Sequence, residues 1–177
     1  MKKYLLIILL PHIFLLGCKR LAEFTRFDLK YDESIVIPAT LGVNLPFNMF
    51  TPKIESDSES EFAVNDTRKD LIEEINLTTL ELTITSPSNG DFSFLESIII
   101  FLEADSLPEI EIASREDIPN DTGNFLEMNT SDMDLQDYIK KDNFRLRVNT
   151  VTKKMIGSDH HIAIHAVFFV DAKVLGL

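Results

Sequence analysis

The chain has one cysteine, Cys18, no tryptophan and only six glycines among its 177 residues. A single thiol excludes a disulfide within the chain and a metal site built from several thiolates. The lack of tryptophan weakens the case for a surface that stacks sugar rings, although tyrosine and phenylalanine could substitute. Without disulfides or thiolate-bound metals, the stability of the protein has to come from a hydrophobic core.

Motifs of catalysis are also missing. The sequence contains no Gly-x-Ser-x-Gly, no His-Glu-x-x-His and no glycine-rich loop that cradles phosphate. The sequence therefore predicts a protein that is not an enzyme and needs no cofactor. A hydrolase whose site is dispersed along the chain is the weakest of the alternatives.

Positive charge is scarce. Lysine and arginine number 17 against 29 aspartates and glutamates, which gives a formal net charge of −12. An acidic protein repels the phosphate backbone, so nucleic acid is not expected as a partner.

The beginning of the chain has the character of a secretory signal. Two lysines precede an apolar stretch from Tyr4 to Leu16, which matches the charged and apolar regions of a signal peptide. A helix that crosses a membrane needs about 20 consecutive apolar residues. This stretch is shorter and is followed closely by Lys19 and Arg20, which favours removal of the segment over retention.

The tetrapeptide Leu15-Leu16-Gly17-Cys18 resembles the bacterial lipobox, where a peptidase cuts before a cysteine that carries a diacylglyceryl group. The resemblance implies lipid attachment at Cys18 and a membrane partner reached through this anchor. Two or three acyl chains together hold a protein at a bilayer lastingly. Residues 1–17 are then a lipoprotein signal peptide, and residues 18–177 form a single β-sandwich domain.

Two further features bear on the cell envelope. Asp105-Ser106-Leu107 resembles the motif at which Bacteroidota O-glycosylate exported proteins, which implies Ser106 as an acceptor. Surface lipoproteins of Bacteroidota often carry acidic residues directly after the lipidated cysteine, whereas here Lys19 and Arg20 follow Cys18. We therefore expect the protein to be anchored at the periplasmic face of the outer membrane.

Alternation of apolar and polar residues runs through most of the mature chain. It predicts strands at 27–31, 79–86, 97–104, 109–114, 143–150 and 160–170, with 97–104 as a central strand, and proline-punctuated runs predict edge strands at 34–38 and 47–54. Capping signatures predict short helices at 67–75, from Thr67 with Asp70, and at 131–141, from Ser131 with Asp134.

Several short strands without a strict alternation with helices favour an antiparallel architecture. The predicted fold is mainly β: a two-layer, immunoglobulin-like sandwich with two short helices. Leu82, Ile100, Leu146 and Ile164 are predicted to be buried.

Three histidines near the end of the chain raise the question of a metal site. His161 and His165 are four residues apart, which on a helix would suit zinc. On the predicted strand they lie about 13 Å apart, too far for one ion. Together with His160 they are therefore interpreted as histidines of an exposed face, and no metal ligand is predicted.

Alternate carboxylates at Glu55, Asp57, Glu59 and Glu61 could collect calcium, but the glycine that turns an EF-type loop is missing. We interpret residues 55–61 as a polar loop.

Two apolar segments suggest contacts. Residues 41–50 are interpreted as core or edge strand, with an exposed contact for a partner or lipid as the alternative. Phe92 and Phe94 are interpreted as a plug at one end of the sandwich, with loop-tip contacts as the alternative.

Together these features predict an envelope lipoprotein that binds a protein or glycan without catalysis, as a component of an outer-membrane assembly. The alternative is a lipoprotein that holds lipid or a small ligand in an apolar cavity between its sheets.

Overall fold

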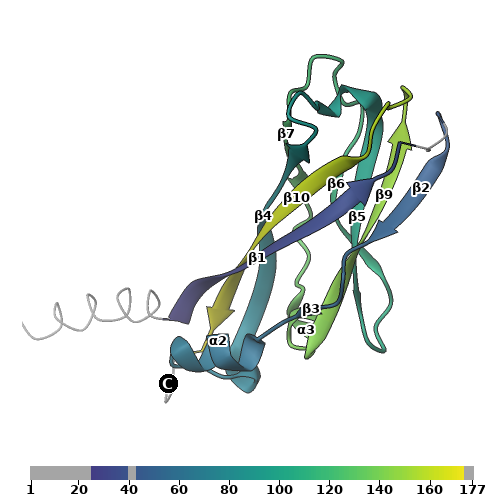
Figure 1. Ribbon diagram of the computed structural model, residues 1–177. Coiled ribbons are helices and arrows are strands. Elements are labelled where there is room, and N and C mark those ends of the chain that lie inside the picture. The colour runs from purple at the N-terminus through teal and green to yellow at the C-terminus, as the bar shows by residue number, and fades with distance from the viewer. Residues whose placement is uncertain (1–24, 40–42, 174–177) are drawn as a thin grey trace, which may run out of the picture.

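The computed structural model describes residues 25–39 and 43–173. Two antiparallel sheets pack face to face (Figure 1). Sheet A has the order β1 (Arg26–Ile37), β10 (His160–Ala172), β4 (Ile72–Ser86), β7 (Phe125–Glu127). Sheet B has the order β2 (Pro46–Phe50), β9 (Asn143–Thr152), β5 (Leu95–Ala104), β6 (Ile110–Arg115), β8 (Asn129–Thr130), and β3 (Ile54–Glu55) also pairs with β9. The fold predicted as an immunoglobulin-like sandwich is thus confirmed as two packed antiparallel sheets with two short helices.

The strands form where polar and apolar residues alternate, because every second side chain then points into the space between the sheets. In β10 the inward positions include Ile162, Ile164, Phe168 and Val170, all almost completely buried. The burial predicted for Leu82, Ile100, Leu146 and Ile164 is confirmed, with at most 2% of each residue exposed. The edge and central positions are confirmed, since β1 and β2 each end a sheet and β5 lies between β9 and β6. The bounds differ, because the runs 27–31 and 34–38 form one strand, β1, and the run 47–54 is broken after Phe50.

The helix predicted at 67–75 is wrong. Only Lys69–Leu71 makes a short 3-10 turn, η2, and Ile72 already begins the 15-residue strand β4. Apolar residues of this segment, among them the fully buried Ile75, pair with β10 and pack into the core. Strand pairing therefore overrides the capping signature, and the hydroxyl of Thr67 is left buried without a hydrogen bond.

A helix forms instead in the acidic segment interpreted as a loop. Asp57 adopts a left-handed conformation with φ of 46°, and α2 (Ser58–Val64) follows it. The apolar residue that the helix buries is Phe62, which is completely buried and packs edge-on against Phe27 of β1, with ring centroids 6.0 Å apart. This aromatic ring, together with the buried Ser58, anchors a segment that is otherwise mostly polar.

The second helix is confirmed within its predicted range, although it is short. It comprises Gln136–Ile139, α3. The predicted cap does not form, because the Ser131 hydroxyl is buried without a hydrogen bond, while the Asp134 carboxylate accepts one from the backbone N–H of Gln136 at 3.0 Å.

Aromatic rings join the two sheets near the β1 edge. Tyr31 of β1 contacts Phe168 of β10 at 5.7 Å and, across the sandwich, Phe144 of β9 at 5.1 Å between centroids.

A further 3-10 turn, η3 (Phe92–Phe94), buries Phe92 and Phe94, which confirms their interpretation as a plug.

None of the helices in the described ranges is long and apolar enough to cross a bilayer.

Candidate functional site

The outer face of sheet B carries a group of arginine and aromatic side chains. Strand β9 creates it by alternation, because the residues between Arg145, Arg147 and Asn149 are buried in the core and these three therefore point outward. The neighbouring strands β2 and β5 add Asn48, Phe50 and Phe101 through their register with β9, while an acidic pair, Glu103 and Glu109, lies at its margin.

Arg147 is held in one position from several sides. Its Nε and Nη2 atoms donate to the two carboxylate oxygens of Glu109 at 2.6 and 2.5 Å, and its Nη1 donates to the amide oxygen of Asn48 at 2.5 Å. The guanidinium also lies 4.0 Å from the centre of the Phe101 ring. Such a bidentate, stacked arginine has almost no rotational freedom left, and its side chain is 17% exposed.

Arg145 makes a similar but more exposed arrangement. Its Nε donates to Glu103 at 2.5 Å, and its guanidinium lies 4.7 Å from the centre of the Phe50 ring. Phe50 is 48% exposed, although it belongs to a strand of the sheet. The ring is therefore presented to solvent with a guanidinium fixed beside it.

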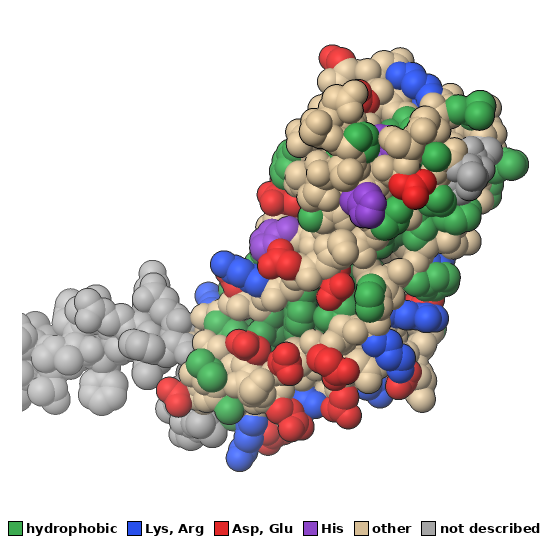
Figure 2. Space-filling view, in the orientation of Figure 1, with side chains coloured by type: hydrophobic (Ala, Val, Ile, Leu, Met, Phe, Trp, Pro, Cys, Tyr) green, Lys and Arg blue, Asp and Glu red, His purple; other side chains and the backbone are tan. Residues whose placement is uncertain are grey.

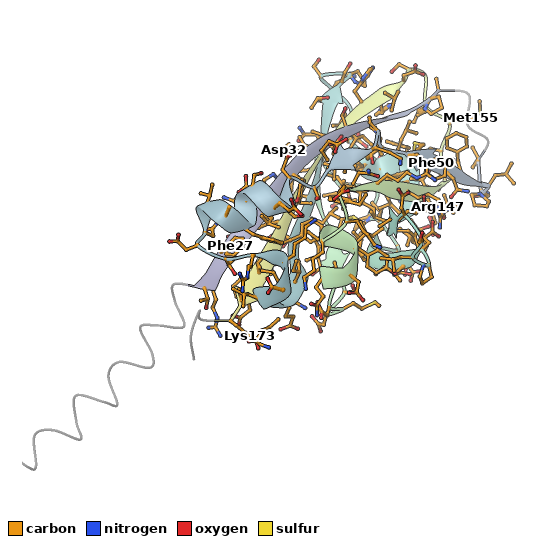
Figure 3. The ribbon with its side chains drawn as sticks, turned by 90° about the horizontal axis from the view of Figure 1, so that it is seen from below. Phe27, Asp32, Phe50, Arg147, Met155 and Lys173 are labelled. Carbon is orange, nitrogen blue, oxygen red and sulfur yellow. The ribbon has the colours of Figure 1, made fainter. Side chains whose placement is uncertain are left out.

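We call Asn48, Phe50, Phe101, Arg145 and Arg147 the arginine strip. Figure 3 shows Phe50 and Arg147 on the same side of the molecule as Met155, away from Phe27 and Lys173. Met155 is 79% exposed.

The charges of the arginine strip are balanced. The hydrogen bonds from Arg147 lower the pKa of Glu109, and the same bonds raise the pKa of Arg147, so both groups stay ionised. A surface of this kind attracts a partner through planar stacking and apolar contact more than through net charge. Aromatic rings and arginine are the residue types enriched at protein interfaces.

Three hollows on the surface bear on the predicted apolar cavity. Their volumes are about 490, 210 and 260 Å³, and charged side chains contribute much of each lining. They give no support to the alternative of a ligand held in an apolar cavity. The first hollow lies between β1 and the segment that contains β3.

The predicted lipid attachment site, Cys18, lies outside the described residues, as does the whole predicted signal peptide.

Ser106, the predicted acceptor of a glycan, is exposed in the turn between β5 and β6 and has a left-handed conformation with φ of 66°. The backbone N–H of Leu107 closes that turn on the carbonyl of Ala104 at 3.2 Å.

The histidines do not share one face, so the interpretation of all three as exposed is wrong for one of them. His160 is only 7% exposed and packs against Phe94, with ring centroids 4.7 Å apart, because consecutive residues of a strand point to opposite sides. His161 and His165 do point outward, and the Nδ1 atom of His165 lies 2.6 Å from a carboxylate oxygen of Asp32. In the part of the chain that the structure describes, no three His, Cys, Asp or Glu side chains are grouped to hold a metal ion.

The carboxylates of the acidic segment 55–61, considered above as calcium ligands, do not converge on one position either. Glu55 lies in β3, Asp57 precedes α2, and Glu59 and Glu61 lie on the helix. Glu59 forms an ion pair with Lys69 at 3.3 Å.

Of the segment 41–50, residues 41 and 42 lie outside the described ranges, and the remainder divides between the two interpretations given to it. Met49 is buried, as expected of an edge strand, whereas Leu45 and Phe50 are exposed by 63% and 48%.

The arginine strip was missed by the sequence analysis. The alternation of Arg145 and Arg147 on a predicted strand was a visible signal, since two arginines on one face of a sheet need acceptors or aromatic rings close by. Their partners Glu103 and Glu109, 42 and 38 residues away, become neighbours only once the sheet is assembled.

No family model matches the chain, and no curated protein matches its sequence. Among solved structures, the chain is similar over 85% of its length to a structure of infectious bursal disease virus, Gx strain, at 9% identity and a TM-score of 0.44. It spans 33% of the length of that viral chain. A structure of the decameric BFDV capsid protein matches 84% of this chain and 99% of its own, at 8% identity and a TM-score of 0.38. Scores this low support no inference about function.

Proposed function

We propose that the protein is a lipid-anchored component of the bacterial cell envelope that binds another protein, without catalysis, through the arginine strip. The anchor rests on the lipobox-like residues that end in Cys18. The absence of catalytic motifs from the sequence favours binding over chemistry.

The observation that carries the binding role is the arrangement of Arg145 over the exposed ring of Phe50. An apolar ring that is 48% exposed gains free energy when a partner covers it. The guanidinium and its carboxylate partner Glu103 are already fixed, so association orders few additional rotamers. These are properties of a preformed contact surface.

A protein fits this surface better than a glycan. The chain lacks the tryptophan that most often stacks on sugar rings. Exposed apolar side chains, among them Leu45 and Met155 near the ends of β2 and β9, enlarge the contact with groups that a protein surface supplies and that a hydroxyl-rich glycan does not.

The proposed location is the periplasmic face of the outer membrane. Lys19 and Arg20 would follow the lipidated cysteine directly, and each cation near an anionic headgroup favours the bound state by about 1 kcal/mol. The partner is then expected among periplasmic or outer-membrane proteins.

A photo-crosslinking experiment in the bacterium tests the binding surface. A benzoylphenylalanine side chain at position 50 should give one discrete crosslinked protein after irradiation, and the additional change Arg145→Ala should weaken that band several-fold. Phe125 offers a matched control, because it is also 48% exposed but lies on β7 in the other sheet.

Equal bands from positions 50 and 125, or no band from position 50, would refute the assignment of the strip. A crosslinked product that resists proteases and stains as polysaccharide would identify a glycan and refute the choice of a protein.

A further inference from the structure

Within residues 25–39 and 43–173, no strand pairs with the outer edge of β1. This 12-residue strand ends sheet A, and among the described strands it pairs with β10 alone. Every second residue of an edge strand turns its backbone N–H and C=O away from the sheet, where they can hydrogen-bond to another extended chain.

The largest of the three hollows runs along this edge. Six consecutive residues of β1, from Asp28 to Glu33, line it together with residues around β3 and the start of α2. Successive side chains of a strand point to opposite faces of the sheet. A single hollow can contact side chains on both faces of sheet A only if it follows the edge of β1. This space of about 490 Å³ therefore lies where an added strand would run.

Carboxylates dominate the lining of the hollow. We call the following set the acidic seam: Asp28, Asp32, Glu33, Glu55, Asp57 and Glu61. Lys30 and Lys53 are the cations of the lining, and Lys53 is already paired with Asp105 at 3.8 Å. Figure 2 shows acidic side chains gathered over α2 and the neighbouring part of β1.

Most of the acidic seam is uncompensated. Asp32 lies 2.6 Å from His165, whereas no ion pair with a described residue involves the other five carboxylates. Glu33 points toward the sandwich interior, and burial together with the charge of Asp32 raises its pKa. A cationic group that entered the seam would relieve this repulsion.

The floor of the seam is rigid. The hydroxyl of Tyr31 donates a hydrogen bond to the carbonyl of Ser56 at 2.6 Å and so ties β1 to the segment around β3. The Tyr31 ring is held in place by its edge-on contacts with the rings of Phe144 and Phe168. The seam is therefore formed in advance of binding.

We propose that the open edge of β1 binds an extended basic segment of a partner protein as an additional strand of sheet A, with lysine or arginine at every second position facing the acidic seam. Backbone hydrogen bonds to the edge supply affinity, and the alternate cations supply selectivity. A second copy of this chain is a poor occupant, because its own β1 carries Asp28, Asp32 and Glu33 and would place like charges together.

This surface is separate from the arginine strip. Asp32 lies apart from Phe50 and Arg147 in Figure 3. The two sites can therefore be tested independently.

The binding experiment uses the full chain in a non-ionic detergent and fluorescent peptides as probes. The first peptide alternates lysine and valine, the second has the same composition in one lysine block and one valine block, and the third alternates glutamate and valine. Anisotropy should show saturable binding of the first peptide, at least about tenfold weaker binding of the second and none of the third. Binding should weaken as salt is added.

Backbone pairing is tested by N-methylation of every second residue of the first peptide, in each of the two possible sets. One set removes the N–H groups that face β1 and should abolish binding, while the other set should retain it. Retention of binding by both sets would overturn strand addition.

Two matched triple variants test the seam. Changing Glu33, Glu55 and Glu61 to glutamine should weaken binding of the first peptide by about tenfold, from the sum of two exposed charge interactions and one half-buried one. The control changes Glu74, Glu111 and Glu116, three exposed glutamates outside the seam that form no ion pair with a described residue, and it should change affinity less than about twofold. Equal losses in both variants would show attraction by net charge alone and overturn the proposal. So would formation of a dimer of this chain that excludes the peptide.

Discussion

Replacing Tyr31 with phenylalanine should destabilise the protein at neutral pH and make it less sensitive to alkali. The ring would keep its contacts with Phe144 and Phe168. The hydrogen bond to Ser56 would be lost, and because Ser56 is only 2% exposed, its carbonyl would be left without a partner in a buried position.

The size of the effect depends on pH. The lost hydrogen bond and the unsatisfied carbonyl cost about 1 to 3 kcal/mol below pH 9. Burial, followed by the charges of Asp57 and Glu61, raises the pKa of Tyr31 in the folded protein. An unfolded tyrosine loses its proton near pH 10. The stabilisation from Tyr31 is therefore complete below pH 10 and falls by about 1.4 kcal/mol for each pH unit above it, until the folded protein also ionises.

Urea unfolding at a series of pH values, from about 8 to 11, measures both the cost of the lost hydrogen bond and the dependence of the stabilisation on pH. The free energies of unfolding of the parent and of Tyr31→Phe should differ clearly at pH 8 and approach each other by about 1.4 kcal/mol at pH 11. All other side chains are the same in both proteins, so their contributions cancel in the difference.

A difference that stays constant over this pH range would show that Tyr31 titrates normally in the folded state. Equal stability at pH 8 would show that the bond to Ser56 contributes nothing. Either result would refute the description of a rigid seam floor.

The other predictions concern the anchor, the core and the exposure of the domain. Cys18→Ser should release the protein from membranes or leave its precursor uncut, as shown by fractionation; maturation and membrane binding like those of the parent would contradict the lipid anchor. Ile100→Ala should cost about 2 to 5 kcal/mol in urea unfolding, because the side chain is fully buried; a loss below about 1 kcal/mol would contradict its place in the core. Gly90→Ala should lower the free energy of unfolding by about 1 to 3 kcal/mol, because a Cβ there would lie 2.8 Å from Ile84. Gly123→Ala should be nearly neutral, because nothing lies within 4 Å of a Cβ at that position. Equal losses of stability in both variants would contradict the close packing around Gly90. Protease added to intact cells should leave the protein undigested, and digestion without permeabilisation would place it on the outside.

The sheets could be predicted because alternation is a local property. The run from His160 to Val170 specifies by itself which side chains face the core. Its pairing with β1 runs without a shift, and its pairing with β4 contains register shifts that leave the alternating burial of β10 intact. The buried position of Ile164 follows from the same pattern.

The helices were harder to place, because their evidence in the sequence is only a few residues long. The capping signature at Thr67 and Asp70 precedes apolar residues that suit a strand equally well, and pairing with β10 decides between the two. At α2 the decisive residue, Phe62, comes directly after the polar segment, and its pocket beside Phe27 is formed by a distant part of the chain.

The surfaces could be predicted least. Arg145 and Arg147 are recognisable as neighbours on one face, but their roles depend on Phe50, Phe101 and the carboxylates that the sheet order brings beside them. The acidic seam likewise combines β1 with a segment that starts more than twenty residues later. No spacing in the sequence specifies such encounters.

The pairing of the first strand with the last has a mechanical consequence. β1 and β10 run antiparallel over twelve residue pairs, from Arg26 opposite Asp171 to Ile37 opposite His160, so the start of β1 and the end of β10 lie at the same end of the sandwich (Figure 1). A lipid tether at Cys18 would transmit a pull to the start of β1. When the load is held at the opposite end of the sandwich, the force runs along the strand while the hydrogen bonds lie across it. All twelve residue pairs are then loaded in shear at the same time. A pull between the two chain ends would instead separate the pairs one after another.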